Sequence, residues 1–246
     1  MKKQRRKKSH TGLIVLFSLL AVFSGLVGAM FLIKTETVTV TGNIYVSDEL
    51  ILAQVFPDEG HKTLFHVLIR RFFKKPAIPG MSSVTVVPKA LKHCEIRVKE
   101  KEPVCQIFDG TCYNILTADG LVLFRQAEPA DSIPIINNVP VKSADVLSLI
   151  SVADEESLKT ILIYASRFLE EKIPLETLTV DKDGIRARIG KVTVILGNSF
   201  GAAEKVSEIR DMYPKWQELN LKGILHMEDF TLEKGTAGSY FEVIPE

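Results

Sequence analysis

A short serine motif is the part of this sequence whose residue types come closest to a catalytic set. Residues 197–201 read GNSFG, which fits G-x-S-x-G, and they follow an expected strand and precede an expected helix. In an α/β-hydrolase this turn exposes a nucleophilic serine, here Ser199, with an acid and then a histidine later in the chain. Asp211 and His226 stand in that order downstream. The strands upstream are joined largely by hairpin turns rather than by helices. A parallel hydrolase sheet is therefore not expected, and a tight turn into a helix explains the motif better.

The histidines and cysteines do not form a metal-binding pattern. His61 and His66 are five positions apart, and no carboxylate or thiolate accompanies them in the expected helix. Cys105 and Cys112 flank an Asp-Gly turn. In a two-residue hairpin they would be diagonal neighbours with Cα atoms about 7–8 Å apart, more than a relaxed disulfide usually spans. We interpret the cysteines as small apolar core residues, and a Cys105–Cys112 bridge stays open as the alternative. Neither a metal nor a cofactor is expected from the residues considered, which are His10, His61, His66, His93, His226, Cys94, Cys105 and Cys112.

The charge balance argues against one broad class of function. The chain has 246 residues with 31 Lys and Arg against 30 Asp and Glu, a formal net charge of +1. Six of the basic residues lie within residues 1–10, MKKQRRKKSH, so the remainder carries 25 basic and 30 acidic residues, a net charge of −5. A negatively charged body is not typical of a nucleic-acid-binding domain. The 46% hydrophobic and 25% charged fractions are typical of folded protein.

An uncharged apolar segment follows the basic residues. Residues 11–33, TGLIVLFSLLAVFSGLVGAMFLI, form a run of 23 residues without a charge. As a helix they would span about 34 Å, enough for a hydrocarbon core of about 30 Å. The run is longer than the apolar part of a cleaved signal peptide, which is the alternative interpretation. The positive charges on one flank predict that residues 1–10 form a cytoplasmic tail. The helix at 11–33 would then cross the membrane once, with the body outside and the tail close to anionic lipid.

The elements expected after the membrane helix divide into two regions. Residues 34–102 predict the order β-α-α-β-β. The first helix is capped by Ser47 and runs to Phe56, and a second, apolar and basic helix lies within 61–75. The strands are expected at 35–41, 84–87 and 94–98. Residues 103–246 predict a mostly antiparallel β domain with flanking helices. The fold class is therefore α+β.

The second region contains more strands than helices. A two-residue hairpin is expected around Asp109-Gly110, and residues 133–138 are interpreted as a loop or short edge strand. A helix is expected over 143–172, and a late helix carries Val206, Ile209, Tyr213 and Trp216 on one face. The strands expected in this region are 104–108, 111–116, 121–124, 175–180, 185–189, 192–196, one near 223–230 and one at 239–244.

The ordered set of local motifs resembles the bacterial cell-division family FtsQ/DivIB, and residues 34–102 resemble its POTRA module. The opening strand 38–42, VTVTG, and the junction 98–104, VKEKEPV, carry the resemblance. So do 63–65, TLF, 115–124, ILTADGLVLF, and 133–136, IPII. The chain departs from the family pattern in several places. Lys101 replaces an arginine, Thr117 replaces an aspartate, and 228–230, EDF, stands where the family has D-x-R-Y.

The resemblance implies a non-enzymatic scaffold of the divisome at the division septum of the bacterial cytoplasmic membrane. It implies that FtsB/DivIC-like and FtsL-like coiled-coil proteins bind by adding a strand beside the last β-strands, by β-augmentation. The partner-binding candidates in those strands are Phe230, Tyr240, Phe241 and Val243. Packing of the same side chains on the domain's own helix remains open, and Trp216 is expected in the core. Two alternatives also remain: a membrane-anchored hydrolase using Ser199, and a POTRA-bearing scaffold of another envelope complex.

Overall fold

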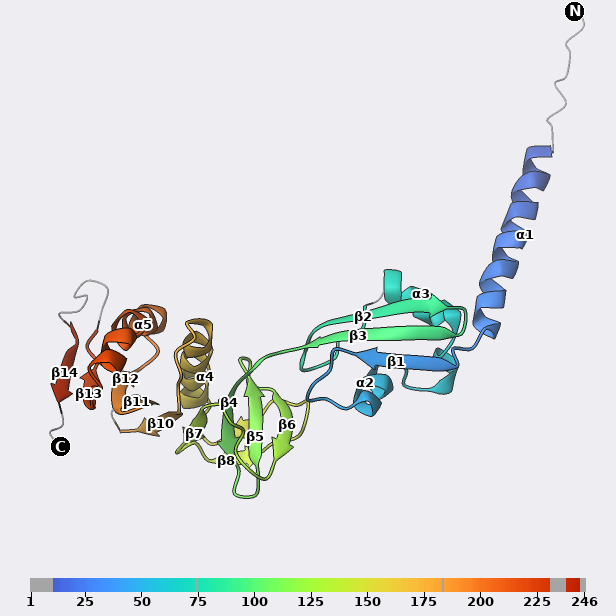
Figure 1. Ribbon diagram of the computed structural model, residues 1–246. Coiled ribbons are helices and arrows are strands. Elements are labelled where there is room, and N and C mark those ends of the chain that lie inside the picture. Colours follow the sequence, from blue (N-terminus) through green and yellow to red (C-terminus); the bar gives the residue numbers. More distant parts are fainter. Residues whose placement is uncertain (1–10, 74, 183, 231–237, 244–246) are drawn as a thin grey trace, which may run out of the picture. The chain divides into compact units, whose positions relative to one another are not determined.

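A computed structural model describes residues 11–73, 75–182, 184–230 and 238–243. The chain divides into two compact units, Met1–Glu100 and Lys101–Glu246 (Figure 1). Each unit has its own sheet and its own hydrophobic core. The predicted basic tail at 1–10 lies outside the described residues.

The first helix, α1 (Thr11–Leu32), contains the apolar run predicted from the sequence (Figure 1). Residues Gly12–Leu32 have a mean hydropathy of 2.5, and none of the most apolar stretch is buried inside the protein. Large side chains such as Leu13, Phe17 and Phe23 are more than half exposed. Among the described residues this is the one helix long and apolar enough to cross a membrane.

The rest of the first unit is a three-stranded sheet with two helices, and the predicted order β-α-α-β-β is confirmed. Its elements are β1 (Thr37–Thr41), α2 (Asp48–Val55), a 3₁₀ turn η1 (Glu59–His61), α3 (Leu64–Phe72), β2 (Met81–Ala90) and β3 (His93–Glu100). The strand order is β1-β3-β2, with β1 parallel and β2 antiparallel to β3. The helix predicted within 61–75 is α3, and before it Asp58 caps the 3₁₀ turn by accepting the His61 N–H at 3.0 Å.

Capping and one buried acid fix the entry to α2. Ser47 accepts a hydrogen bond from the Leu50 N–H, as predicted for an N-cap. Glu100, at the end of β3, is buried, and its carboxylate accepts the N–H groups of Tyr45 and Val46 at 2.9–3.1 Å. Two backbone donors that would otherwise lack partners are thereby satisfied, and the loop before α2 is held on the sheet.

The second unit is built on a nine-stranded sheet in the order β14-β13-β12-β11-β10-β7-β4-β5-β6. Most neighbouring pairs are antiparallel, but β7 is parallel to both β4 and β10, and β13 is parallel to β12. Two helices, α4 (Glu155–Glu170) and α5 (Ala202–Glu218), pack on it, and a two-stranded sheet joins β8 (Val141–Ser143) to β9 (Ser151–Val152). The other strands are β4 (Pro103–Phe108), β5 (Tyr113–Thr117), β6 (Val122–Gln126), β7 (Ile135–Asn137), β10 (Thr177–Asp181), β11 (Gly184–Ile189), β12 (Val192–Gly197), β13 (Gly223–His226) and β14 (Tyr240–Val243).

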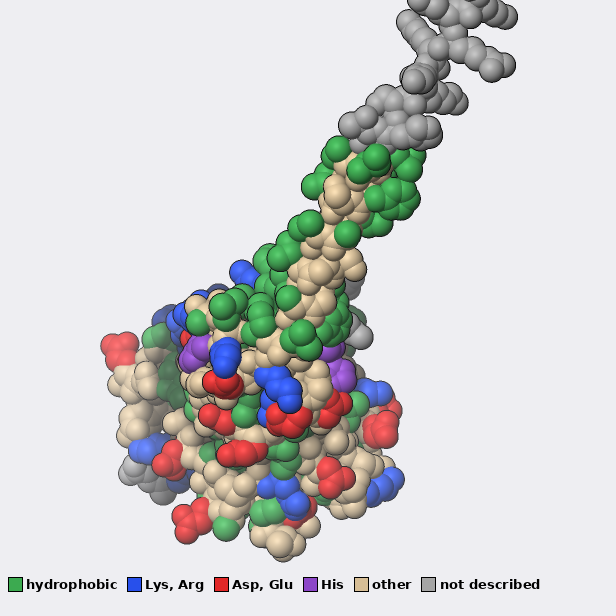
Figure 2. All heavy atoms as spheres, turned by 90° about the vertical axis from the view of Figure 1, so that its right-hand side faces the viewer, with side chains coloured by type: hydrophobic (Ala, Val, Ile, Leu, Met, Phe, Trp, Pro, Cys, Tyr) green, Lys and Arg blue, Asp and Glu red, His purple; other side chains and the backbone are tan. Residues whose placement is uncertain are grey.

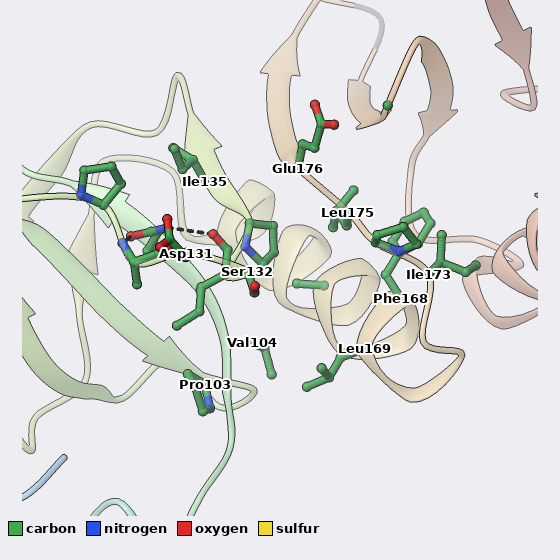
Figure 3. A pocket seen from close by; sticks show the side chains of 18 of the residues that line it. Pro103, Val104, Asp131, Ser132, Ile135, Phe168, Leu169, Ile173, Leu175 and Glu176 are labelled. Atoms are coloured by element: carbon green, nitrogen blue, oxygen red, sulfur yellow. Dashed lines mark hydrogen bonds between the residues drawn. The ribbon is translucent and has the colours of Figure 1, made fainter. Parts of the chain in front are cut away.

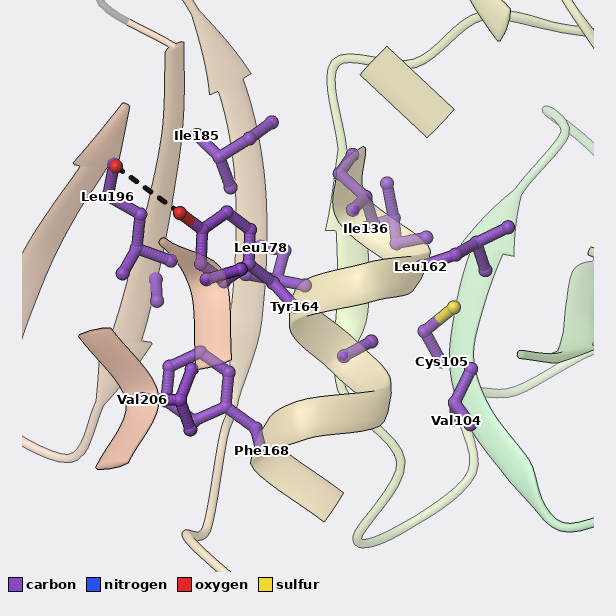
Figure 4. Packing of buried hydrophobic residues seen from close by; sticks show 14 of the residues in the cluster. Val104, Cys105, Ile136, Leu162, Tyr164, Phe168, Leu178, Ile185, Leu196 and Val206 are labelled. Atoms are coloured by element: carbon purple, nitrogen blue, oxygen red, sulfur yellow. Dashed lines mark hydrogen bonds between the residues drawn. The ribbon is translucent and has the colours of Figure 1, made fainter. Parts of the chain in front are cut away.

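Helix α4 packs over the middle of this sheet and joins its two halves (Figure 4). Leu162 points toward Cys105 of β4, whereas Tyr164 and Phe168 point toward the later strands and α5. Tyr164 and Phe168 are fully buried. Burying aromatic side chains of this size is a main source of the domain's stability.

Three sequence-based expectations for this unit were wrong, each because a non-local contact determines the structure. Residues 135–137 form a central strand rather than a loop or edge, since β7 pairs with β4 and β10. Residues 143–154 are not helical. Leu147 has φ 62° and donates a backbone hydrogen bond to the Val122 carbonyl, and the Ser148 carbonyl accepts one from the Val122 N–H. The β4–β5 loop has four residues rather than two, because the Asp109 carboxylate accepts the N–H groups of Thr111 and Cys112 at 2.9 Å.

The three cysteines are free thiols, and two of them, Cys94 and Cys105, are buried. Burial raises the pKa of Cys94 to about 11 and that of Cys105 still further above its usual range. These two are core residues, as predicted. Cys112 instead lies partly exposed in the four-residue loop, where its Sγ approaches Asp109. It is therefore not a core residue, and no disulfide joins it to Cys105.

Candidate partner-binding edge

Strand β14 forms one edge of the nine-stranded sheet (Figure 1). It pairs antiparallel with β13 in the register Gly223↔Val243 to His226↔Tyr240, and no strand of the described chain pairs with its outer side. The opposite edge of the sheet is different. At β6 the N–H of Val122 donates to Ser148 and its carbonyl accepts from Leu147, so the following loop covers the start of that edge. An uncovered edge strand offers backbone donors and acceptors to another chain.

The side of β14 that faces the core carries Phe241. Its ring centroid is 6.5 Å from that of Trp216 on α5, and Phe241 is packed against the main hydrophobic core. On β13, Gly223 pairs with Val243 and lies diagonally across from Phe241, where it leaves the space that this packing requires. A Cβ at Gly223 would lie 2.2 Å from the Glu242 carbonyl oxygen and 2.7 Å from the Phe241 ring. Glycine therefore allows β14 to approach β13 closely.

The other side of β14 carries Tyr240 and Glu242, which lie beside His226 of β13. The rings of Tyr240 and His226 are stacked, with centroids 4.1 Å apart and planes 7° apart. The His226 Nδ1 is 2.9 Å from a Glu228 oxygen, and the Nε2 is 3.6 Å from a Glu242 oxygen. An aromatic ring, an imidazole and two carboxylates therefore form a polar surface over the last two strands.

Burial and hydrogen bonding act in opposite directions on Glu228. Partial burial disfavours the charged form, but hydrogen bonds from His226 and from backbone N–H groups outweigh it, so the pKa of Glu228 lies below its usual value. Glu228 is then ionised at neutral pH. The His226 Nε2 is buried and makes no hydrogen bond within the described chain. Its one nearby acceptor is the Glu242 carboxylate, at a longer distance than a hydrogen bond.

Three of the four predicted partner-binding residues lie together on β14. Tyr240 and Val243 are 61% and 64% exposed, while Phe241 is partly buried against the core. Phe230 is only 5% exposed and belongs to the core, after β13 has ended at His226. Sequence reasoning did not include Glu242 and His226. The period-2 alternation of a strand, applied to 240–243, would have placed Glu242 on the same face as Tyr240.

The serine motif has a structural explanation at the turn between β12 and α5. The Tyr164 hydroxyl donates to the Asn198 carbonyl at 2.6 Å, and the Lys205 Nζ donates to the Leu196 carbonyl at 2.6 Å. Gly197 and Gly201 take the left-handed conformation, with φ 71° and 65°. Lys205 is 1% exposed, and burial lowers its pKa although Glu228 and Asp229 favour the charged form.

The three residues of the hypothetical hydrolase do not form a triad. Ser199 is exposed, and no hydrogen bond links its side chain to a histidine in the described part of the protein. Asp211 pairs with Arg210, whereas His226 pairs with Glu228. In the same residues no group of three or more His, Cys, Asp or Glu side chains is placed to hold a metal ion.

An apolar groove of about 570 Å³ lies between α4 and the segment before β7 (Figure 3). Phe168, Leu169 and Ile173 line one side, and Ser132 and Ile135 lie on the other. Its one buried amide, Gln106, already bonds to backbone groups of Ala130 and Ile133, as its Nε2 donates at 2.8 and 2.6 Å. No His, Cys or Lys is among the described residues that line the groove.

Comparison with known proteins identifies no family for this chain. No family model matches it, and no curated protein matches it.

Proposed function

We propose that this protein is a non-enzymatic scaffold of bacterial cell division, anchored in the cytoplasmic membrane by α1 with its N-terminus in the cytoplasm. Its body lies outside and binds small coiled-coil division proteins, similar to FtsB/DivIC and FtsL, by strand addition at β14. The observation that carries this proposal is that no described strand pairs with the outer side of β14, on which Tyr240 and Val243 are more than 60% exposed.

The first unit supports the same proposal. Two helices lie between β1 and β2, and the order β-α-α-β-β is the one on which the likeness to a POTRA module rests. The unit follows the apolar helix directly, so a POTRA-like module would lie next to the membrane and could contribute to recruitment. The resemblance of the ordered sequence motifs to FtsQ/DivIB adds a reason to place the complex at the septum.

Strand addition suits the chemistry of this edge. A partner strand would gain backbone hydrogen bonds from the outer side of β14, which supply affinity regardless of sequence. Specificity would come from the alternating side chains. Tyr240 offers an exposed ring with a hydroxyl, and Glu242 and Glu228 favour a partner with a basic residue on the adjacent position.

Site-specific photo-crosslinking in living cells tests the proposal. A photoreactive residue replaces Tyr240 or Val243. A matched variant carries it at Phe108, an aromatic on β4 that is 47% exposed and whose ring centroid is 5.0 Å from that of Tyr113. We expect a small single-pass coiled-coil protein to be captured from 240 and 243 but not from 108. Capture from none of these positions at equal protein level, or equal capture from 108, contradicts binding at this edge.

Two further measurements test the septal location and the non-enzymatic role that we propose. A fluorescent fusion of the whole chain should accumulate at the septum; a uniform membrane signal contradicts the division role and favours a scaffold of another envelope complex. A fluorophosphonate probe should leave the purified chain unlabelled. Labelling that disappears in Ser199→Ala contradicts the non-enzymatic part of the proposal.

A further inference from the structure

Helix α3 has an apolar face that its own sheet does not cover. The helix packs on β2 through Val67, which is 1% exposed. At 100° per residue, Phe65, Ile69 and Phe72 lie on the opposite side of the helix from Val67. Phe72 is 70% exposed and the following Phe73 is 87% exposed. Two adjacent phenylalanines with so much accessible surface are unusual for a face that meets only water.

This apolar face is continuous with the membrane helix. The rings of Phe31 in α1 and Phe65 in α3 are stacked, with centroids 3.9 Å apart. The Leu64 N–H donates to the Ile33 carbonyl at 2.9 Å, so α3 begins where the apolar run ends. Hydrophobic side chains extend from the apolar helix onto the body at its base, where Lys, Arg, His, Asp and Glu side chains lie beside them (Figure 2).

The C-terminal end of α3 is positively charged and has no acidic counterpart. Arg70, Arg71 and Lys75 form no ion pair with any described residue, and the helix LFHVLIRRF contains no acid. Arg70 lies over the Phe56 ring at 5.6 Å. The acids that precede the helix are already paired with their own neighbours, since Asp58 bonds His61 and Glu59 bonds Lys62.

We infer that α3 is an interfacial membrane-binding helix whose exposed phenylalanines enter the boundary between headgroups and acyl chains, and whose basic residues bind anionic phospholipid headgroups. Aromatic and basic side chains on one helix are the combination that binds such a surface. The site is held against the bilayer by α1, so local concentration favours docking. This inference rests on the membrane anchoring proposed above and is independent of the division partner.

The depth of position 72 in a bilayer can be measured directly in the whole chain. The variant Phe72→Trp, and Phe73→Trp as a second position, is reconstituted into vesicles of brominated phosphatidylglycerol or brominated phosphatidylcholine. The parent chain, whose only tryptophan is Trp216, supplies the background. We expect bromine quenching at 72 and 73, stronger with phosphatidylglycerol. Each cation should change the ratio of docked to undocked helix about fivefold.

The matched control is Ile44→Trp, which is 79% exposed and follows β1 at the end away from α1. Five residues of strand separate it from the membrane end of the unit by about 16 Å, so its fluorescence should not be quenched. A combined Arg70→Gln, Arg71→Gln and Lys75→Gln variant should lose most of the quenching at 72. Arg71 and Lys75 are exposed, whereas Arg70 lies over the Phe56 ring, so circular dichroism must show that the variant keeps the fold of the parent.

The outcomes separate this inference from the proposed function. A chain that floats with vesicles but shows no more quenching at 72 than at 44 contradicts the interfacial helix alone. Equal quenching in neutral and anionic vesicles contradicts the assignment to anionic lipid. A chain that does not float with vesicles contradicts both the anchor and the inference that rests on it.

Discussion

Substitution of Phe241 by Ala should release β14 from the sheet without unfolding the second unit. Phe241 is the one described residue of β14 whose side chain packs on the core, where it meets Trp216. Full burial of a phenylalanine contributes about 1.5–3 kcal/mol, and Phe241 is partly exposed, so we take about 2 kcal/mol as its contribution. That loss raises the ratio of open to docked β14 about 30-fold.

Trp216 reports this release because it is the only tryptophan of the chain and is 6% exposed. In Phe241→Ala its fluorescence emission should shift to the red, and hydrogen exchange of the β13 amides should accelerate about 30-fold. The comparison variant is Tyr240→Ala, on the exposed face of the same strand, which should leave both signals close to those of the parent. Unchanged emission and exchange in Phe241→Ala, or equal changes in both variants, would refute the assignment of Phe241 as the anchor of β14.

Three other substitutions test this edge and two other contacts of the second unit, in the whole chain in detergent, with unfolding followed by Trp216 emission. Gly223→Ala should destabilise β14 by about 2 kcal/mol or more, because the added carbon would lie 2.2 Å from the Glu242 carbonyl oxygen; an unshifted emission spectrum would contradict the tight approach. Tyr164→Phe should lower the free energy of unfolding by about 1 kcal/mol, because the Asn198 carbonyl loses its 2.6 Å hydrogen bond. Asp109→Asn should lower it by about 1 kcal/mol at pH 7. Hydrogen bonds from backbone and side chains hold the pKa of Asp109 below its ordinary 3.8, so its stabilising effect is complete above that pH and is lost as the pH falls below it. The unfolding free energies of the parent and of Asp109→Asn should therefore converge in acid. A difference that stays constant down to pH 2 would show that the Asp109 carboxylate is not the source of the stabilisation.

Local signals in the sequence predicted much of the fold. Ser47 followed by two acids predicted the start of α2, and alternating residues predicted β1, β3 and the β11–β12 pair. Each of these signals lies within a few residues of the element that it predicts. The uncharged run at 11–33 likewise predicted α1.

Non-local pairing accounts for what the sequence could not predict. Strand β7 has three residues, too few for a clear period, and its position follows from pairing with Gln106 and Thr177, far away in the chain. The segment 144–150 has apolar residues at helical spacing, but its hydrogen bonds go to Gly120 and Val122. Tertiary contacts override local propensity in such cases.

The candidate edge was predicted in part. Aromatic residues near the C-terminus indicated a strand, and the structure describes β14 there. Which of them would be accessible depended on where β13 ended. Because the strand ends at His226, Phe230 turns into the core instead of continuing along the edge. The role of His226 beside Tyr240 depends on the register between two strands, which the sequence alone does not specify.

The central position of β7 has a consequence for the order of folding. On one side of it, β4, β5 and β6 are joined by short antiparallel connections, and on the other side β10, β11 and β12 are joined in the same way. These local pairs close small loops, whereas β7 joins β4 and β10 across about 30 and about 40 residues. Closing such loops costs more entropy before any contact repays it. The two halves are therefore expected to form first, and the docking of three residues between them is the step that completes the sheet and sets the rate at which this unit folds.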